Sequence, residues 1–437
     1  MITRPPILES PPWTFPIPEV TRLNTGLTVW TYNLPGQFIL SCNLVLELPL
    51  NAEPEGKEGV ATIAVRTLDE GTHAHPGSAF ARALEEVGAH FNGLVGLSTT
   101  QCLLDLPYDG LDCALALFAE AVTTPAYAPK DVARIQANRL AEIEQQESRG
   151  SFLASTALRK SVLASHLRIA RPAGGSSDQV SAIHSSDVTG FHSAHYRSDG
   201  ATLIIAGDLS GIDAIGSAVK AFDGWNPCTP PTPPDPVSPG TPSHHLIHRE
   251  GAVQADIRLG WYGIDRGDPR WAPLQVGLAI MGGTFNSRLN AVLREERGYT
   301  YGVSMSAHPF RSGGTIDVAT STRTSAAPDL IEETLEILMA TEPFTQDEVH
   351  NAVGYLTLSA PLSLDTADAV ASQAATIAAA HLDLDHVTST LRDLRRVTPE
   401  SAMEAYRALI DPHRASIIVV GDTEEIPAMD FDFVDSY

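Results

Sequence analysis

The sequence has little cysteine, little positive charge and no long apolar run. Its four cysteines show no CxxC spacing, so neither a zinc ribbon nor a disulfide framework is expected, and thiols in a reducing compartment fit better. No window approaches the ~20 apolar residues of a membrane helix. The proline-rich start, MITRPPILESPPWTFPIPEV, has too short an apolar run for a signal peptide. We therefore predict a soluble, cytoplasmic protein.

Basic residues are outnumbered, with 29 Lys and Arg against 53 Asp and Glu, which gives a formal charge of −24. Since no polybasic run interrupts this acidity, neither nucleic acid nor an anionic membrane is an expected partner. The acidity is compatible with attraction of cationic peptides, although acidity alone usually serves solubility. A chain of 437 residues predicts about two to four domains.

Proline is concentrated in one internal stretch, Trp225–His245, with the sequence WNPCTPPTPPDPVSPGTPSHH. This density excludes a helix or a central strand and favours an extended, semi-rigid spacer. The parts on either side end alike, in ATLIIAGDL (201–209) and ASIIVVGDT (415–423). A Tyr-Arg pair precedes each of these runs, which favours an internal duplication. We predict an N-terminal domain, a linker and a C-terminal domain, over residues 1–226, 227–245 and 246–437.

Short β-rich runs alternate with amphipathic helical segments in both halves. This pattern predicts an α+β fold in which each half is a mixed or antiparallel sheet packed with helices. The expected strands cover residues 27–32, 40–48, 94–106, 201–209, 255–261, 300–307, 314–320 and 415–423. One helix is expected to begin near residue 59. The other expected helices cover residues 79–87, 110–122, 130–147, 271–281, 287–296 and 328–339.

The stretch GVATIAVRTLDEGT, residues 59–72, resembles the signature helix of the pitrilysin/insulinase-type zinc peptidases, roughly G-x-A-H-x-x-E-H-x-L-x-x-G-T. A zinc peptidase helix needs two histidine ligands on one face and a glutamate that activates water. The resemblance places the two metal-binding histidines on Thr62 and Arg66 and the catalytic glutamate on Val65. None of these side chains can replace the original one. We therefore expect no metal in this chain.

The same resemblance places the family's third ligand, a glutamate on a later helix, on Glu142. One carboxylate does not make a zinc site, and Glu142 could instead pair with Arg66 where the metal would lie. The alternative is an exposed helical glutamate with no special role. The framework stretches LEEVGAHFNGLVGLSTT (84–100) and TTPAYAPKDVARIQ (123–136) also resemble the family, so that the departures concentrate on the catalytic residues.

Two histidine pairs outside this helix could suggest another metal site. His244 and His248 lie four residues apart in HHLIHRE, but they lead into a strand, where this spacing gives no shared helical face. His73 and His75 lie in an expected loop. We interpret both pairs as structural or solvated.

The stretch GGTFNSRLNAVLREERGYTYGVSMSAH, residues 282–308, resembles the family segment L-G-G-x-x-S-R-L-x-x-x-L-R-E-x-x-G-L-x-Y. The resemblance assigns the substrate-contacting arginine to Arg294 and the tyrosine to Tyr301. A guanidinium offers a fork of donors to a peptide carbonyl or carboxylate, and a phenol can donate to an oxyanion. Taken singly, Arg294 could pair with a glutamate on a helix surface, and Tyr301 could belong to a strand core.

The resemblance implies a non-catalytic subunit of a heterodimeric, two-chain zinc metallopeptidase, of which this chain forms one half of a clamshell. Arg294 and Tyr301 would then act on a peptide held at the zinc of a homologous partner that carries an intact His-x-x-Glu-His helix. The peptide would add a strand to an exposed sheet edge. The substrate could be a natural-product leader peptide or a peptide from general turnover. The alternative is an inert peptide-binding or scaffold protein, as the core subunits of respiratory complexes imply.

Overall fold

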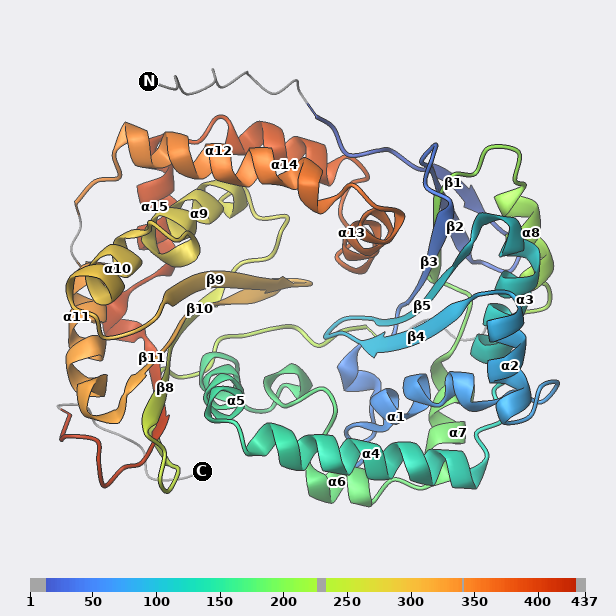
Figure 1. Cartoon of the computed structure of the whole chain (residues 1–437), viewed down its shortest axis with the longest axis horizontal. Helices are drawn as coiled ribbons and strands as arrows, with labels where there is room; N and C mark the ends of the chain where they lie inside the picture. The colour runs from blue at the N-terminus through green and yellow to red at the C-terminus, as the bar shows by residue number, and fades with distance from the viewer. Residues whose placement is uncertain (1–12, 226–232, 340–341, 430–437) are drawn as a thin grey trace, which may run out of the picture.

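The computed structural model describes residues 13–225, 233–339 and 342–429. Most of the N-terminal stretch considered as a signal peptide, and residues 227–232 of the predicted linker, lie outside these ranges. Two separate sheets, each with its own group of helices, lie next to one another (Figure 1). The predicted α+β class, with two sheets packed with helices, is confirmed. In the described ranges no helix has the length and apolar character needed to cross a bilayer.

The first sheet has six strands in the order β1-β2-β6-β3-β5-β4. Its strands are β1 (Glu19–Arg22), β2 (Thr28–Asn33), β3 (Ile39–Leu46), β4 (His90–Val95), β5 (Thr100–Pro107) and β6 (Thr202–Gly207). The helices of this half are α1 (Val60–Arg66), α2 (Ser78–Glu86), α3 (Leu111–Thr123), α4 (Pro129–Glu147), α5 (Gly150–Val162), α6 (Ser177–Ser181), α7 (Ser185–His195) and α8 (Ala214–Ala221).

The second sheet has five strands in the order β7-β11-β8-β10-β9. Its strands are β7 (His244–His248), β8 (Gln254–Gly263), β9 (Val303–Phe310), β10 (Gly313–Arg323) and β11 (Ser416–Gly421). The helices of this half are α9 (Trp271–Leu278), α10 (Arg288–Asn290), α11 (Ala327–Met339), α12 (Gln346–Ser363), α13 (Ala367–Ala379), α14 (His386–Leu394) and α15 (Pro399–Leu409), with π-helical turns at Ala279–Gly283 and Ala291–Glu296.

The two sheets share one topology once β1 is set aside. The order β2-β6-β3-β5-β4 corresponds strand for strand to β7-β11-β8-β10-β9. The pairs β2/β6 and β7/β11 are parallel, and the remaining pairs in both series are antiparallel. Equal order and equal direction support the duplication inferred from the matching ends of the two halves.

Several predicted elements differ from the observed ones. The strand expected at 94–106 is a hairpin, because the chain turns at Gly96, whose N–H donates to the carbonyl of Thr99 (2.8 Å). The helices expected at 271–281 and 287–296 both change into π-helical turns before they end. Hydrophobic periodicity does not distinguish a π turn from the α-helix that precedes it.

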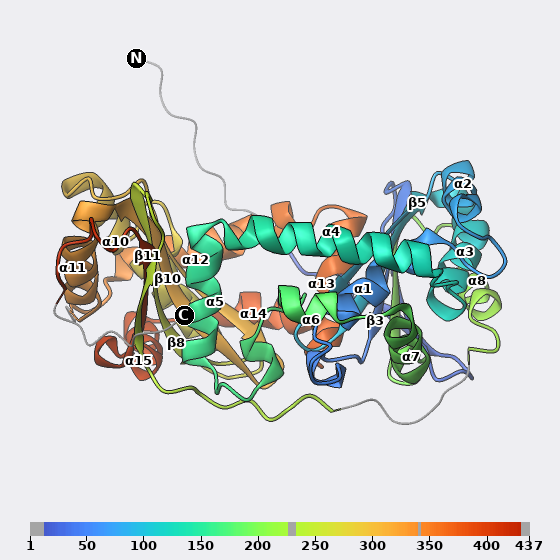
Figure 2. The ribbon, with the colours of Figure 1, turned by 90° about the horizontal axis from the view of Figure 1, so that it is seen from below.

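Each half supplies one helix to the other half's sheet. Helix α5, from the first half, packs against β8 and β11, while α13, from the second half, packs against β3 and β6. In Figure 2, α5 follows the end of the long α4 and stands beside the second sheet, near β8 and β11. Small residues allow the close approach: a Cβ at Gly260 on β8 would lie 2.7 Å from Leu158 on α5.

Candidate functional site

A buried carboxylate fixes the start of α1. Glu53 accepts hydrogen bonds from the N–H groups of Gly59 (2.9 Å) and Ala61 (3.0 Å), which have no partner inside the helix. Arg168 donates to the same carboxylate through Nε (2.8 Å), and both side chains of this pair are buried. Gly59 has φ of +100°, where a side chain would be strained. The position of α1 therefore depends on a buried ion pair.

Helix α1 carries Thr62, Val65 and Arg66, the three positions at which the sequence resemblance predicts the lost metal ligands and the lost catalytic glutamate. Thr62 and Val65 are buried, and Arg66 is exposed. Arg66 donates through Nη1 to both carboxylate oxygens of Glu142 on α4, at 2.8 and 2.7 Å. The predicted pair between Arg66 and Glu142 is confirmed. Arg139 also donates to Glu142 (3.2 Å).

The two guanidinium groups keep Glu142 ionised. Desolvation alone would raise the pKa of Glu142, but the hydrogen bonds and charges of Arg66 and Arg139 outweigh it and hold the pKa below its usual value. A carboxylate that already accepts from two arginines has little capacity left for a metal ion. Within the described parts of the chain, no three His, Cys, Asp or Glu side chains come together as a metal site. The donors around α1 therefore do not suit zinc.

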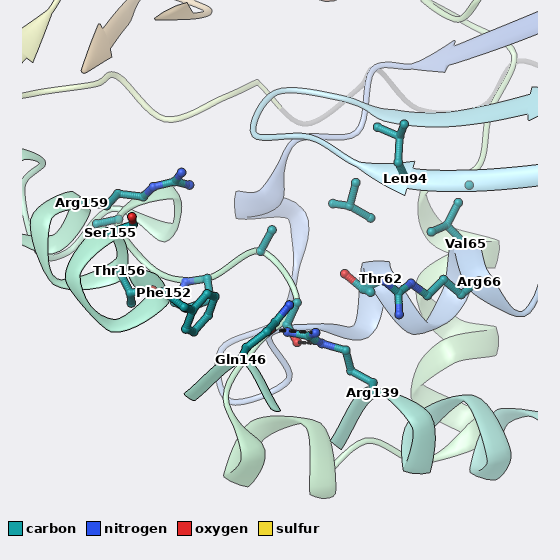
Figure 3. Close-up of a pocket in the computed structure, with 16 residues that line it drawn as sticks. Thr62, Val65, Arg66, Leu94, Arg139, Gln146, Phe152, Ser155, Thr156 and Arg159 are labelled. Carbon is teal, nitrogen blue, oxygen red and sulfur yellow. Dashed lines mark hydrogen bonds between the residues drawn. The ribbon is translucent and has the colours of Figure 1, made fainter. Parts of the chain in front are cut away.

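A cavity of about 470 Å³ lies against these residues. Four elements and one loop contribute to its wall, so that it lies where the first sheet's edge, α4 and the exchanged helix α5 meet (Figure 3). It is lined by Thr62, Val65 and Arg66 of α1, by Gly93, Leu94 and Val95 of β4, by Arg139 and Gln146 of α4, by Phe152, Ser155, Thr156 and Arg159 of α5, and by Ala170, Pro172, Ala173 and Gly174.

Strand β4 forms one wall of the cavity and is also the last strand of its sheet. It pairs with β5 alone among the described strands, so that its other edge has no neighbour in the sheet. It passes close over α1, since a Cβ at Gly93 would lie 2.5 Å from the Val65 side chain. An unpaired edge beside a cavity is the geometry that accepts an extended peptide as an added strand.

Arg294 and Tyr301 lie in the second half, and neither lines this cavity. Arg294 is in the π-helical turn Ala291–Glu296, with its guanidinium carbon 3.5 Å from the centroid of the Phe285 ring. Its Nη2 donates to Glu295 (2.6 Å), and its Nε is buried without a hydrogen-bond partner among the described residues. The pairing with a neighbouring glutamate that we considered for Arg294 is therefore present, yet the buried Nε is left without a partner among the described residues.

Tyr301 is 96% exposed, so the alternative that places it in a strand core is wrong. The predicted strand at 300–307 begins only at Val303, because the chain first turns. In that turn the Thr300 hydroxyl accepts from the N–H of Gly302 (3.1 Å) and donates to the carbonyl of the same residue (3.0 Å). This turn presents the phenol to solvent.

One histidine of each pair contacts a neighbouring side chain. His244 and His248 are the ends of strand β7, and His248 Nδ1 lies 2.8 Å from the Thr423 hydroxyl. His75 Nδ1 lies 3.0 Å from each carboxylate oxygen of Glu120. The interpretation that neither pair forms a metal site agrees with these contacts.

Three residues near the two sites were not recognised from the sequence. Arg139 precedes Glu142 by one helical turn, a spacing that could have indicated an ion pair. Arg159 reaches the cavity only because α5 crosses to the other sheet, and no local pattern encodes this crossing. Phe285 contacts Arg294 across a turn, and the sequence between these two residues does not indicate this contact.

Known proteins resemble this chain over both halves. Residues 40–171 match the sequence profile of insulinase (peptidase family M16), and residues 182–356 match that of the peptidase M16 inactive domain. An uncharacterized zinc protease of Rickettsia bellii is 25% identical over 336 residues, which cover 76% of this chain and 81% of that protein.

Solved structures share the fold. The crystal structure of a peptidase M16 inactive domain from Pseudomonas fluorescens has a TM-score of 0.85 and 24% sequence identity, and the match covers 94% of this chain and all of that one. A chain of complex III2 from Candida albicans, with Inz-5 bound, has a TM-score of 0.78 and 14% identity over 94% of this chain and 98% of that one.

Proposed function

Since this chain belongs to peptidase family M16, we propose that it is the non-catalytic subunit of a heterodimeric zinc peptidase. A homologous partner with an intact His-x-x-Glu-His helix holds the zinc, and this chain supplies Arg294 and Tyr301 to the bound peptide. The two chains form a clamshell, with this chain as one half. The substrate is an extended peptide, from a natural-product leader or from general turnover.

One observation carries the proposal. Arg66 and Glu142, at two of the positions that would hold zinc, bind each other, whereas Arg294 donates, among the described residues, only to the adjacent Glu295. Tyr301 is almost fully exposed, and Arg294 keeps a buried Nε without a partner in the described part of the chain. An arginine fork and a phenol can bind a peptide carbonyl and stabilise an oxyanion, but neither can activate water in the absence of a metal.

The test is hydrolysis of an unstructured peptide by the chain alone, by its catalytic homologue alone, and by both together. We expect negligible activity from this chain and zinc-dependent activity from the pair. Tyr301→Phe should lower kcat of the pair by about 10²–10³, the usual effect of removing one oxyanion donor. Arg294→Ala should mainly raise KM, because a fork that binds the substrate is lost.

Arg297→Ala is the matched control, because Arg297 lies three residues from Arg294 and pairs with Glu333 (2.9 and 2.8 Å). Its hydrolysis rate should equal that of the unmodified pair. A complex that forms but cleaves equally well with the Tyr301→Phe or Arg294→Ala substitution would contradict the proposal and favour the inert scaffold. Cleavage by this chain alone, abolished by a chelator, would contradict it as well.

A further inference from the structure

Helix α5 contributes one arginine, Arg159, to the wall of the cavity. Among the described residues, no acidic side chain forms an ion pair with it. No hydrogen bond or ion pair joins its guanidinium to another side chain in those ranges, whereas Arg66 and Arg139 are both engaged with Glu142. Figure 3 shows the Arg159 side chain extending from α5 into the space that faces the strand carrying Leu94. Arg159 is an exposed residue that lines the open cavity, and desolvation by the neighbouring protein lowers its pKa.

The surroundings of Arg159 are positive despite the acidity of the whole chain. Three arginines line the cavity, Arg66, Arg139 and Arg159. A nearby glutamate, Glu142, accepts hydrogen bonds from the first two. His308, on the second sheet, is close enough to Arg159 for the two charges to interact. The carboxylate of Asp317 lies 2.7 Å from His308 Nε2 and accepts a hydrogen bond from that ring. Arg258 of β8 donates to Ser155 Oγ (3.3 Å) beside Arg159. No acidic group among these is left for Arg159.

The cavity and the strand edge are continuous, because Gly93, Leu94 and Val95 of β4 belong to both. A peptide paired with this edge would send alternate side chains toward opposite faces of the sheet. One such side chain, or the chain's end, would enter the cavity. Its volume of about 470 Å³ lies within the range of small-ligand sites and has room for one long side chain.

We propose that this cavity binds a carboxylate of the extended peptide, with Arg159 as its principal partner and the hydroxyl of Thr156 beside it. The inference rests on the proposed function and specifies its substrate class. A guanidinium offers a planar, bidentate fork to a carboxylate. The carboxylate is either the peptide's C-terminus or an Asp or Glu side chain, which share this chemistry.

The test measures binding of N-terminally labelled ten-residue peptides to the full chain by fluorescence anisotropy. Four peptides share one β-prone sequence: one with a free C-terminus, one with an amidated C-terminus, and two amidated forms with a central Glu or Gln. We expect at least one carboxylate peptide to bind about tenfold or more tightly than its neutral counterpart. Long-range repulsion from the net charge of −24 works against this preference, so a positive result is specific.

Two substitutions should move this preference in opposite directions. Arg159→Leu should remove the discrimination and leave binding of the neutral peptide unchanged. Glu142→Gln should strengthen binding of the carboxylate peptide several-fold, because it removes the negative charge that competes for Arg66 and Arg139. Arg22→Leu is the control: Arg22 lies on β1, at the opposite edge of the same sheet, and should change nothing.

The outcomes separate this inference from the proposed function. Equal affinity for carboxylate and neutral peptides, or full discrimination in the Arg159→Leu variant, overturns the carboxylate site and leaves the subunit role intact. Absence of binding by all four peptides also overturns the site, while the role of the subunit is decided by hydrolysis with the partner. A preference for the free C-terminus alone, or for Glu alone, supports the site and identifies the source of the carboxylate.

Discussion

Arg66, at the position where the resemblance predicts a metal ligand, is a permanent cation and gives Glu142 an electrostatic partner. The pair is about 40% exposed on both sides, so water screens it and its contribution to stability is small. The ion pair between Glu53 and Arg168, which fixes the start of α1, is almost fully buried. Removing one partner there leaves an uncompensated charge without solvent.

This contrast predicts different stabilities for two similar substitutions. Arg168→Met should lower the free energy of unfolding by about 3–5 kcal/mol, because it leaves Glu53 buried and unpaired. Arg66→Met should lower it by no more than about 1 kcal/mol. Urea denaturation followed by circular dichroism measures both. Equal losses in the two variants would contradict the assignment of Glu53 and Arg168 as the anchor of α1.

At the scale of elements, a further ion pair connects α10, which leads into the π-helical turn that carries Arg294, to α12. Arg288, at the start of α10, donates to Glu348 through Nε (2.7 Å) and Nη2 (2.8 Å). Glu348 also accepts from the N–H of Thr345 at the start of α12 (2.8 Å). These hydrogen bonds, led by those from Arg288, lower the pKa of Glu348 to about 2.

The lowered pKa gives a pH-dependent prediction. Because the pKa of Glu348 is lower in the folded than in the unfolded chain, where it is about 4.3, the pair stabilises fully above that value. Its contribution is lost as the pH falls toward about 2. Glu348→Gln should therefore destabilise by about 1–3 kcal/mol at pH 7 and progressively less below pH 4. Denaturation at pH 7 and pH 3 tests this, and a loss that does not depend on pH would contradict it.

Sequence reasoning predicted those elements best that carry strong local patterns. Helix α4 was expected at 130–147 and covers Pro129–Glu147, because its apolar spacing is regular and a proline marks its first turn. The hairpin of β4 and β5 was predicted as one strand, since a glycine within a β-rich run does not reveal a turn by itself. At the site, family resemblance located Arg66 and Glu142, but Arg159 depends on the crossing of α5, which is a tertiary feature.

At the scale of the whole molecule, the exchange of α5 and α13 packs the two halves against each other. Val45 and Ile204 of the first sheet are covered by alanines of α13, and Ile418 and Val420 of the second by α5. Arg311, between β9 and β10, adds an ion pair to Glu47 of the first half (2.7 and 3.0 Å). The halves are therefore separate in topology but not in packing.

Separate expression of the halves tests this dependence. Residues 1–226 alone should aggregate or lack fixed tertiary structure, because the sheet face with Val45 and Ile204 loses its cover. Co-expression with residues 227–437 should restore a soluble complex with native near-UV circular dichroism. Cooperative folding of the fragment 1–226 by itself would contradict the role given to α13.

The exchanged helix α13 also has a consequence during protein synthesis. All six strands of the first sheet have been translated by Gly207, but the helix that shields one of its faces ends only at Ala379. At typical rates of elongation, synthesis of the chain from Gly207 to the end of α13 takes about 10–30 s. During this interval an apolar surface is exposed next to the ribosome, so the chain should engage a chaperone that recognises such surfaces before translation ends.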